Sequence, residues 1–218
     1  MKKNLLITGA CVASLFDVSC FGATTIKPYV GANVAITGVA WTNELKDMTE
    51  DLFELPTSFW GMGFDFGARF ANDNIYNCGL TLAYDYVFDS KARITSYAKP
   101  YISSVKTGFS AFGLTFDNYL RVSEKDEKRG DIVLGLGLAN IKERIYQLPT
   151  AAGIANGLEK TDARDNGGAF ILKIGYNSKI DDNWDWNITG RWFITSGDSD
   201  EKDFDAMFIL SFGARYVF

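Results

Sequence analysis

The segment at 58–70 reads SFWGMGFDFGARF and alternates between two kinds of side chain along its whole length. The even-numbered positions from Trp60 to Phe70 are apolar and mostly aromatic. The odd-numbered positions from Phe59 to Arg69 are half glycine and include two charged residues. Successive side chains of a β-strand point to opposite faces. The pattern therefore predicts a strand with one apolar face and one face of small or polar groups.

Seven further segments follow the same alternation. They are 27–41, 76–88, 106–122, 131–140, 169–177, 184–195 and 206–218. Asn72, Asp73 and Asn74 lie between 58–70 and the next segment, and such residues favour a tight turn. These two strands are therefore predicted to form a hairpin. Each of the eight can reach the roughly 9 to 11 residues that a tilted membrane-spanning strand needs.

The connections alternate in length. The short ones are 72–74, 123–130 and 178–183, and the mostly longer ones are 42–57, 89–105, 142–167 and 196–204. Short periplasmic turns and long extracellular loops are typical of outer-membrane barrels. The chain is therefore predicted to be all-β, an eight-stranded antiparallel up-and-down transmembrane β-barrel with both termini in the periplasm.

The composition of the two faces indicates which one meets lipid, since a soluble lipocalin-like barrel or sandwich would alternate as well. In all eight segments the apolar face lacks Asp, Glu, Lys and Arg, apart from Lys106 at the loop end of its segment. Lipid imposes that exclusion, because Lys or Arg at the bilayer midplane costs about 2 to 4 kcal/mol. Aromatic residues near both ends of the apolar face predict two interfacial girdles. The predicted girdle residues are Trp60, Tyr76, Tyr84, Tyr86, Tyr176, Trp184, Trp186 and Trp192.

The N-terminal residues 1–22 have the order of a secretory signal peptide. Lys2 and Lys3 precede a mostly apolar stretch at 5–16, and small residues occupy positions 20 and 22. Cleavage before Ala23 fits best, with cleavage one residue later as the alternative. The expected mature chain is 23–218, a single outer-membrane barrel domain.

The three cysteines bear on two alternatives. Cys11 and Cys20 lie within the predicted signal peptide, so Cys78 is expected to be the one cysteine of the mature chain and to form no intramolecular disulfide. A lipoprotein would be acylated at Cys20. The residue three positions earlier is Asp17, where bacterial lipoprotein signals usually carry an aliphatic side chain, so lipidation is not favoured.

The C-terminal residues 211–218 read SFGARYVF. Ser211, Gly213, Tyr216 and Phe218 resemble the C-terminal signal that the barrel-assembly machinery reads in bacterial outer-membrane barrels. With the signal peptide, this makes the mature chain similar over its whole length to small OmpA/OmpX-type and opacity-protein-like surface barrels. The resemblance implies a Gram-negative outer-membrane location, contact with outer-membrane lipid, and assembly by that machinery.

Charged residues on the other face are predicted to meet inside the barrel. They are Asp65, Arg69, Asp85, Asp117, Arg121, Lys173, Asp185, Arg191 and Arg215. Unpaired charges in a confined space are costly, and the interior of an eight-stranded barrel is just wide enough for side chains to fill it. We expect a salt-bridge network that plugs the lumen. An ion-selective constriction is the alternative.

Composition excludes several functions. The chain has no His, and the outer-membrane lipases, deacylases, palmitoyltransferases and omptin proteases resemble one another in needing one as a base near neutral pH. We therefore expect no enzyme activity, no catalytic or metal site and no cofactor. The net charge of −5 and scattered Lys and Arg residues argue against nucleic acid as a partner.

Because the lumen is expected to be plugged, any specific function is expected to lie in the loops. Residues 148–155 form an apolar patch, and Tyr97 and Tyr101 lie in another loop. Such residues suit adhesion to a host or other cell-surface ligand, a structural and surface-interaction role. They could equally extend the barrel wall as hairpins. The alternative function is a narrow porin-like channel or a transporter for small or hydrophobic solutes.

Overall fold

The computed structural model describes residues 25–71, 76–122, 130–195 and 204–218. Its elements, in chain order, are β1 (Thr25–Trp41), α2 (Asn43–Thr49), β2 (Phe53–Glu54), β3 (Ser58–Ala71), β4 (Tyr76–Lys91), β5 (Arg93–Ile94), β6 (Ile102–Arg121), β7 (Gly130–Pro149), α3 (Ala151–Ala155), β8 (Thr161–Lys179), β9 (Trp184–Thr195) and β10 (Phe204–Val217). The described helices include none that is long and apolar enough to cross a membrane.

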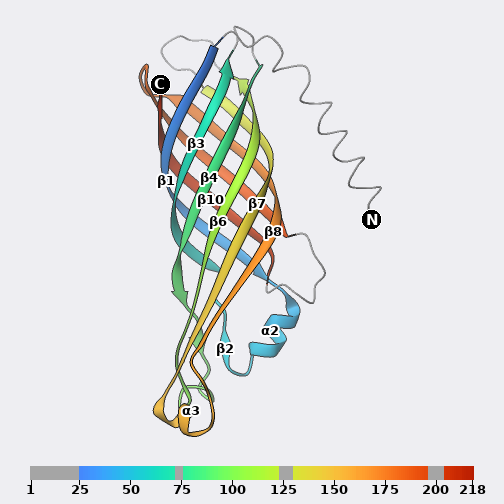
Figure 1. Ribbon diagram of the computed structural model, residues 1–218, viewed down its shortest axis with the longest axis vertical. Coiled ribbons are helices and arrows are strands. Elements are labelled where there is room, and N and C mark those ends of the chain that lie inside the picture. The colour runs from blue at the N-terminus through green and yellow to red at the C-terminus, as the bar shows by residue number, and fades with distance from the viewer. Residues whose placement is uncertain (1–24, 72–75, 123–129, 196–203) are drawn as a thin grey trace, which may run out of the picture.

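Eight long strands close into an antiparallel barrel in the order β1-β10-β9-β8-β7-β6-β4-β3 (Figure 1). Each strand pairs with its neighbours along the chain, and β1 closes the ring by pairing with both β3 and β10. The predicted fold class, an eight-stranded up-and-down barrel, is confirmed.

The apolar face points out of the barrel. On β3, Trp60, Phe64 and Phe66 are 66%, 47% and 56% exposed, whereas Asp65 between them is 5% exposed. Side chains at the odd positions fill the interior, and those at the even positions form the outer surface. The direction of the alternation agrees with the sequence prediction.

The predicted loop at 142–167 is mostly strand, so this prediction was wrong. β7 and β8 remain paired from Gly130↔Ser178 to Gln147↔Thr161, and β6 stays paired with β7 up to Ile102↔Pro149. The ladder continues, but the apolar face ends near position 141 because 142–147 reads KERIYQ. The hydrophobic alternation therefore stops before the strand does.

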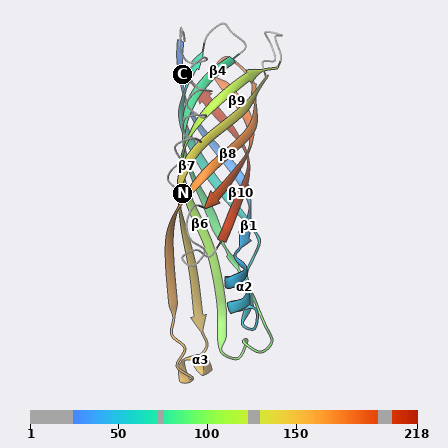
Figure 2. The same cartoon turned by 90° about the vertical axis from the view of Figure 1, so that its right-hand side faces the viewer.

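These extensions form what we call the arm, namely residues 102–108, 142–149 and 161–167 of β6, β7 and β8. Figures 1 and 2 show the arm running well beyond the rest of the barrel, with α3 at its tip and the C-terminus at the opposite end. The structure thus has the wall-extending hairpin that the sequence left as an alternative.

The connection at 42–57 also has structure that was not predicted. It contains α2, whose N-cap Thr42 accepts a hydrogen bond from the Leu45 amide at 3.3 Å. β2 in the same connection pairs with β5, which follows β4. These short elements lie against the end of the barrel that carries the arm (Figure 1).

Several predictions fall on residues that the structure does not describe. The signal peptide, the turn at 72–74 and most of 123–130 and 196–204 lie outside the described residues. Cys78 is buried and disulfide-bonded. The expectation of no intramolecular disulfide concerned the mature chain and stays a prediction.

Candidate functional site in the barrel lumen

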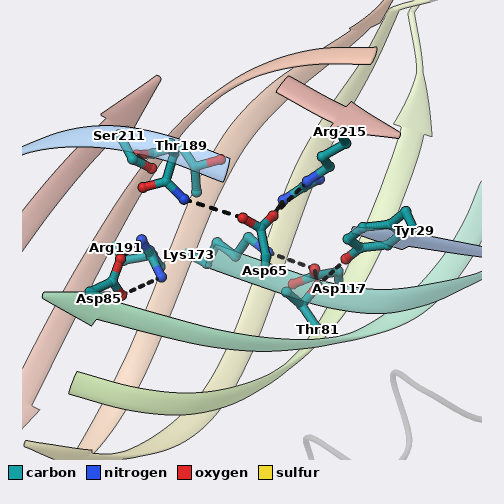
Figure 3. A network of polar contacts seen from close by, with 11 residues as sticks. Tyr29, Asp65, Thr81, Asp85, Asp117, Lys173, Thr189, Arg191, Ser211 and Arg215 are labelled. Atoms are coloured by element: carbon teal, nitrogen blue, oxygen red, sulfur yellow. Dashed lines mark hydrogen bonds and ion pairs between the residues drawn. The ribbon is translucent and has the colours of Figure 1, made fainter. Parts of the chain in front are cut away.

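Acidic and basic side chains meet inside the barrel (Figure 3). Lys173 on β8 forms an ion pair with Asp117 on β6, Arg215 on β10 with Asp65 on β3, and Arg191 on β9 with Asp85 on β4. All six side chains are at most 7% exposed. We call these six residues the charged layer.

The Lys173–Asp117 pair is extended by neutral donors. The Lys173 Nζ lies 2.6 Å from Asp117 Oδ2, and the Thr81 hydroxyl donates to the same oxygen at 2.5 Å. The Tyr29 hydroxyl lies 2.5 Å from Thr81 Oγ1. The chain from Tyr29 to Lys173 links β1, β4, β6 and β8, so the pair ties four strands together.

Glycine makes room for two of the pairs. Gly31 on β1 is the register partner of both Asp65 and Arg215, which meet across it at 2.6 Å. A Cβ on Gly31 would lie 2.8 Å from Arg215 Cγ. Gly135 on β7 stands in the same way between Asp117 and Lys173. A side chain at either glycine would displace an ion pair.

The third pair spans the lumen. The Arg191 guanidinium donates to both carboxylate oxygens of Asp85, at 2.7 and 2.6 Å. Such a bidentate pair has one planar geometry, which fixes both side chains. Because β9 and β4 are not neighbours in the barrel order, this pair crosses the interior between opposite walls.

The remaining predicted lumen charges lie nearer the end of the barrel that holds the C-terminus. Arg69 pairs with Asp131 at 2.8 Å and lies 4.5 Å from the ring centre of Tyr119. Arg121 shows no ion pair with another described residue, and its Nε is buried. Asp185 is half-buried and is the register partner of Arg215. Asp131, which the sequence analysis did not single out, is the acid that Arg69 uses.

Little space remains between these side chains. The cavity at this level has a volume of about 20 Å³, and five residues of the charged layer line it, all except Asp117, together with residues that include Asn33, Thr115 and Ile171. A single water needs roughly 10 to 15 Å³ measured in this way. The cavity therefore has room for one water and not for a hydrated ion.

Above the charged layer, toward the arm, most side chains in the lumen are apolar, although Thr37, Thr107 and Glu143 are also buried there. Phe109 contacts the rings of Trp41, Phe59 and Phe204, at centroid distances of 5.6, 5.4 and 5.5 Å. Other buried apolar side chains surround them. The group includes Val39, Val87, Ala111, Ile141, Ile171, Phe193, Met207 and Ile209. We call this group with the four rings the apolar stopper.

The expectation that the lumen face carries mainly small or polar residues with a few charges was therefore wrong for this half. The sequence does indicate this apolar half of the lumen. Phe59, Phe109 and Phe193 occupy odd positions, which face the lumen, close to the loop ends of their strands. Phe53 and Leu55, from the connection at 42–57, join the stopper from outside the barrel wall. The Trp41 indole donates to the Pro56 carbonyl at 2.8 Å and fixes this connection over the mouth.

The predicted girdle residues with described side chains belong to the outer face. Trp184 and Trp192 stand near opposite ends of β9 and are 44% and 43% exposed. Neighbouring aromatics pack edge to face or at a tilt, as in Trp192–Phe208 with 4.7 Å between ring centres. The others are Trp60, Tyr84, Tyr86, Tyr176 and Trp186, while the side chain of Tyr76 lies outside the described residues.

The residues of the predicted C-terminal assembly signal divide between the two faces. Ser211 is buried in the lumen, where its hydroxyl donates to the Thr189 carbonyl at 3.2 Å, and Gly213 shares its face. The Tyr216 and Phe218 rings pack against each other with centres 5.1 Å apart. Recognition by the assembly machinery stays a prediction.

The arm exposes both apolar and charged groups to solvent. Tyr97 and Ile154 near its tip are 75% and 63% exposed. Asp162 accepts hydrogen bonds from Arg144 at 2.9 Å and from Arg164 at 3.2 Å. These two guanidinium groups lower the pKa of the Asp162 carboxyl to about 2, the hydrogen bond from Arg144 having the larger effect.

No protein-family model and no curated protein sequence matches the chain. Solved structures do match. Ail, the attachment invasion locus protein of Yersinia pestis in complex with the heparin analogue sucrose octasulfate, has a TM-score of 0.54 at 12% identity, with 89% of this chain and 100% of Ail covered.

Two further structures have a similar likeness. Neisserial surface protein A has a TM-score of 0.51 at 14% identity, over 88% of this chain and 97% of that chain. The outer membrane protein OprG from Pseudomonas aeruginosa has a TM-score of 0.51 at 11% identity, over 88% and 95%. Identities this low show a shared fold alone. The chain has the eight-stranded β-barrel fold of the small bacterial outer-membrane proteins of the OmpA/OmpX type.

Proposed function

We propose that this chain is an integral protein of the bacterial outer membrane with a surface-interaction role in adhesion. In this proposal, residues 1–22 are removed on export, and the barrel is a closed scaffold that anchors the arm. The observation that carries the proposal is the combination of a filled lumen with a three-stranded arm that projects beyond the wall (Figure 2).

The outer surface supports the membrane location. Exposed apolar residues run around the strands, and a soluble protein rarely leaves so large an apolar surface in water. The long connections and the arm lie at the end away from the C-terminus (Figure 1). Outer-membrane barrels place long loops outside the cell, so we assign the arm to the extracellular side.

The filled lumen supports a role other than transport. The charged layer leaves about 20 Å³ at mid-height, and the apolar stopper lies above it. A solute would have to displace both. The cavity among the described lumen residues is too small for a substrate, and we also propose that the protein is not an enzyme.

The arm supports contact with another surface. Its tip presents Tyr97, Tyr101, Leu148 and Ile154, which are between 37% and 75% exposed. Exposed apolar groups that project from a rigid scaffold are typical of binding loops. Ail, an attachment invasion locus protein with this fold, supports the view that such a barrel can serve attachment.

The test compares adhesion with and without the arm. In the shortened variant, Asn-Gly replaces residues 145–163, so that Arg144 and Arg164, which are register partners, flank a two-residue turn. The matched control is the double change Tyr97→Ser and Ile154→Ser, which alters the tip and keeps the strands. All variants are displayed on non-adherent bacteria and tested for binding to cultured host cells and to heparin-coated surfaces.

The proposal predicts that the full-length protein confers adhesion and that the shortened variant loses most of it. The tip control should have an intermediate loss. Each variant must run faster on gels unheated than boiled, which shows that the barrel is folded. Equal adhesion by the shortened variant would contradict the proposal. Solute uptake into liposomes by the full-length protein would favour the channel or transporter alternative.

A further inference from the structure

A second cavity lies outside the lumen, beside the mouth of the barrel. Its volume is about 570 Å³, and it lies among α2, β2 and the turn after β5. Figure 1 shows α2 and β2 beside the base of the arm. We call it the mouth pocket. The residues that line it include Trp41, Phe53 and Leu55 on one side and Lys46, Arg93 and Lys99 at the rim.

Hydrogen bonds fix the walls of the mouth pocket. Thr95 donates through its hydroxyl to the Asp51 carbonyl at 2.7 Å and through its amide to the Leu52 carbonyl at 3.1 Å. Phe53 pairs with Ile94 in the two-stranded sheet. The two connections therefore hold each other in place, and the pocket does not have to be ordered by a ligand.

The inner wall of the mouth pocket is apolar. Trp41, Phe53 and Leu55 reach it from the apolar stopper and are each at most 7% exposed. Ile94 completes this side. Ligand pockets of roughly 300 to 1,000 Å³ are typically lined by apolar and aromatic side chains with a few polar groups. In size and in lining, the mouth pocket fits that description.

The rim of the mouth pocket is basic on balance. Lys46, Arg93 and Lys99 line it with Glu50 and Glu54, which leaves one positive charge, three minus two, on a chain whose net charge is −5. Arg93 and Glu54 are 4.0 Å apart, and their side chains are 88% and 75% exposed. An ion pair this exposed is weak, so Arg93 can exchange it for a ligand.

We propose that the mouth pocket binds a small amphipathic anion, with an aromatic or aliphatic body against Trp41, Phe53 and Leu55. Its phosphate, sulfate or carboxylate group meets Lys46, Arg93 and Lys99 at the rim. The proposal does not depend on adhesion by the arm, because none of the residues that define the arm, 102–108, 142–149 and 161–167, lines the pocket. The shared chemistry is an apolar body with one anionic group, which a soluble molecule or a single-chain lipid could supply.

The test uses 1-naphthyl phosphate as the probe and isothermal titration calorimetry on the barrel in zwitterionic lipid nanodiscs. Ser96→Trp places a large side chain in the mouth pocket. Its matched control is Met48→Trp, because Met48 lies on α2, is 72% exposed and does not line the pocket. A second variant, Lys46→Gln with Lys99→Gln, removes rim charge without filling the space. The neutral probe is 1-naphthalenemethanol.

The proposal predicts saturable binding of one probe per barrel in the wild type and in Met48→Trp. Ser96→Trp and the double rim variant should each weaken binding by roughly tenfold or more, and the neutral probe should bind the wild type correspondingly more weakly. If a lysophospholipid competes with the probe, the natural ligand is a lipid. If it does not compete, the natural ligand is a soluble molecule. Lack of saturable binding, unchanged binding in Ser96→Trp, or equal binding of both probes would overturn the proposal.

Discussion

The two halves of the lumen close the barrel by different physical means. The apolar stopper fills space with aromatic and aliphatic side chains grouped around Phe109. The charged layer fills it with ion pairs such as Lys173–Asp117, whose partners are 4% and 0% exposed. Ile171 and Lys173 lie two residues apart on β8 and belong to different halves. Substitutions at these two positions therefore compare apolar packing with ion pairing on one strand.

The apolar stopper and the charged layer should differ in how well they tolerate amino-acid substitutions. Apolar packing is spread over many contacts, so loss of one methyl group changes little else. An ion pair in a buried site depends on one partner, and removal of that partner leaves a charge that the surroundings were not built to hold. We therefore expect the charged layer to tolerate substitution less well than the apolar stopper.

The largest effect is expected for Lys173→Met. It leaves Asp117 buried without its counter-charge, and breaking a buried pair typically costs about 3 to 5 kcal/mol, less where water enters. Urea unfolding in lipid vesicles measures the change in the free energy of unfolding. Asp117→Asn in the same background should recover part of the loss, which a double-mutant cycle quantifies. Additive losses from the two changes would mean that the pair is not coupled.

A smaller effect is expected where a side chain is added beside an ion pair. Gly31→Ala places a Cβ 2.8 Å from Arg215 Cγ, and overpacking of this kind costs about 1 to 3 kcal/mol. Gly38→Ala on the same strand is the control, because its Cβ would meet nothing closer than the Thr57 carbonyl oxygen at 4.0 Å. Equal urea midpoints for the two variants would contradict the role given to Gly31.

Within the apolar stopper, Ile171→Val should cost only about 0.5 to 1.5 kcal/mol, since it removes one methylene from a packed site. The same urea unfolding measurement applies. If Ile171→Val proves as costly as Lys173→Met, the two halves do not differ in tolerance, and the comparison fails.

The smallest effect is expected for an ion pair outside the lumen. The pKa of Asp162, about 2, lies below its ordinary value of 3.8. Its contribution to stability is therefore present above about pH 4 and is lost as the pH falls toward 2. Arg144→Gln should raise this pKa toward 3.8 in an NMR titration, and Arg164→Gln should raise it less. Because the ion pairs of Asp162 with Arg144 and Arg164 are exposed, the free energy of unfolding near pH 7 should hardly change in either variant. A large decrease in this free energy would contradict the prediction.

Much of the fold could be predicted because period-2 alternation assigns every residue of a strand to one face. The same rule placed Asp65, Asp117 and Lys173 in one lumen. It could not say that Asp85 meets Arg191, since these residues lie on non-adjacent strands and their meeting depends on the register around the whole barrel. Alternation in the sequence predicts which face of a strand a side chain occupies. Its level along the barrel axis depends on the strand register around the closed ring.

The sequence left the arm as one of two alternatives and did not predict its length, for a related reason. Residues 142–147 carry no continuous apolar face, so a rule based on hydrophobic alternation ends the strand at the edge of the lipid. Backbone pairing has no such requirement, and the ladder continues to Gln147↔Thr161. The connection at 42–57 folds through a helix cap and a two-residue strand, which are too short to give a periodic signal.

Planar-bilayer conductance of the wild type, Lys173→Met and Phe109→Ala tests most directly whether the two halves close the lumen. We expect no discrete conductance steps from the wild-type barrel. We also expect none from either single variant that remains folded, because the unaltered half still fills the bore. Stable, ion-selective steps from the wild type would contradict it, above all if Lys173→Met changed their selectivity while the free energy of unfolding stayed the same.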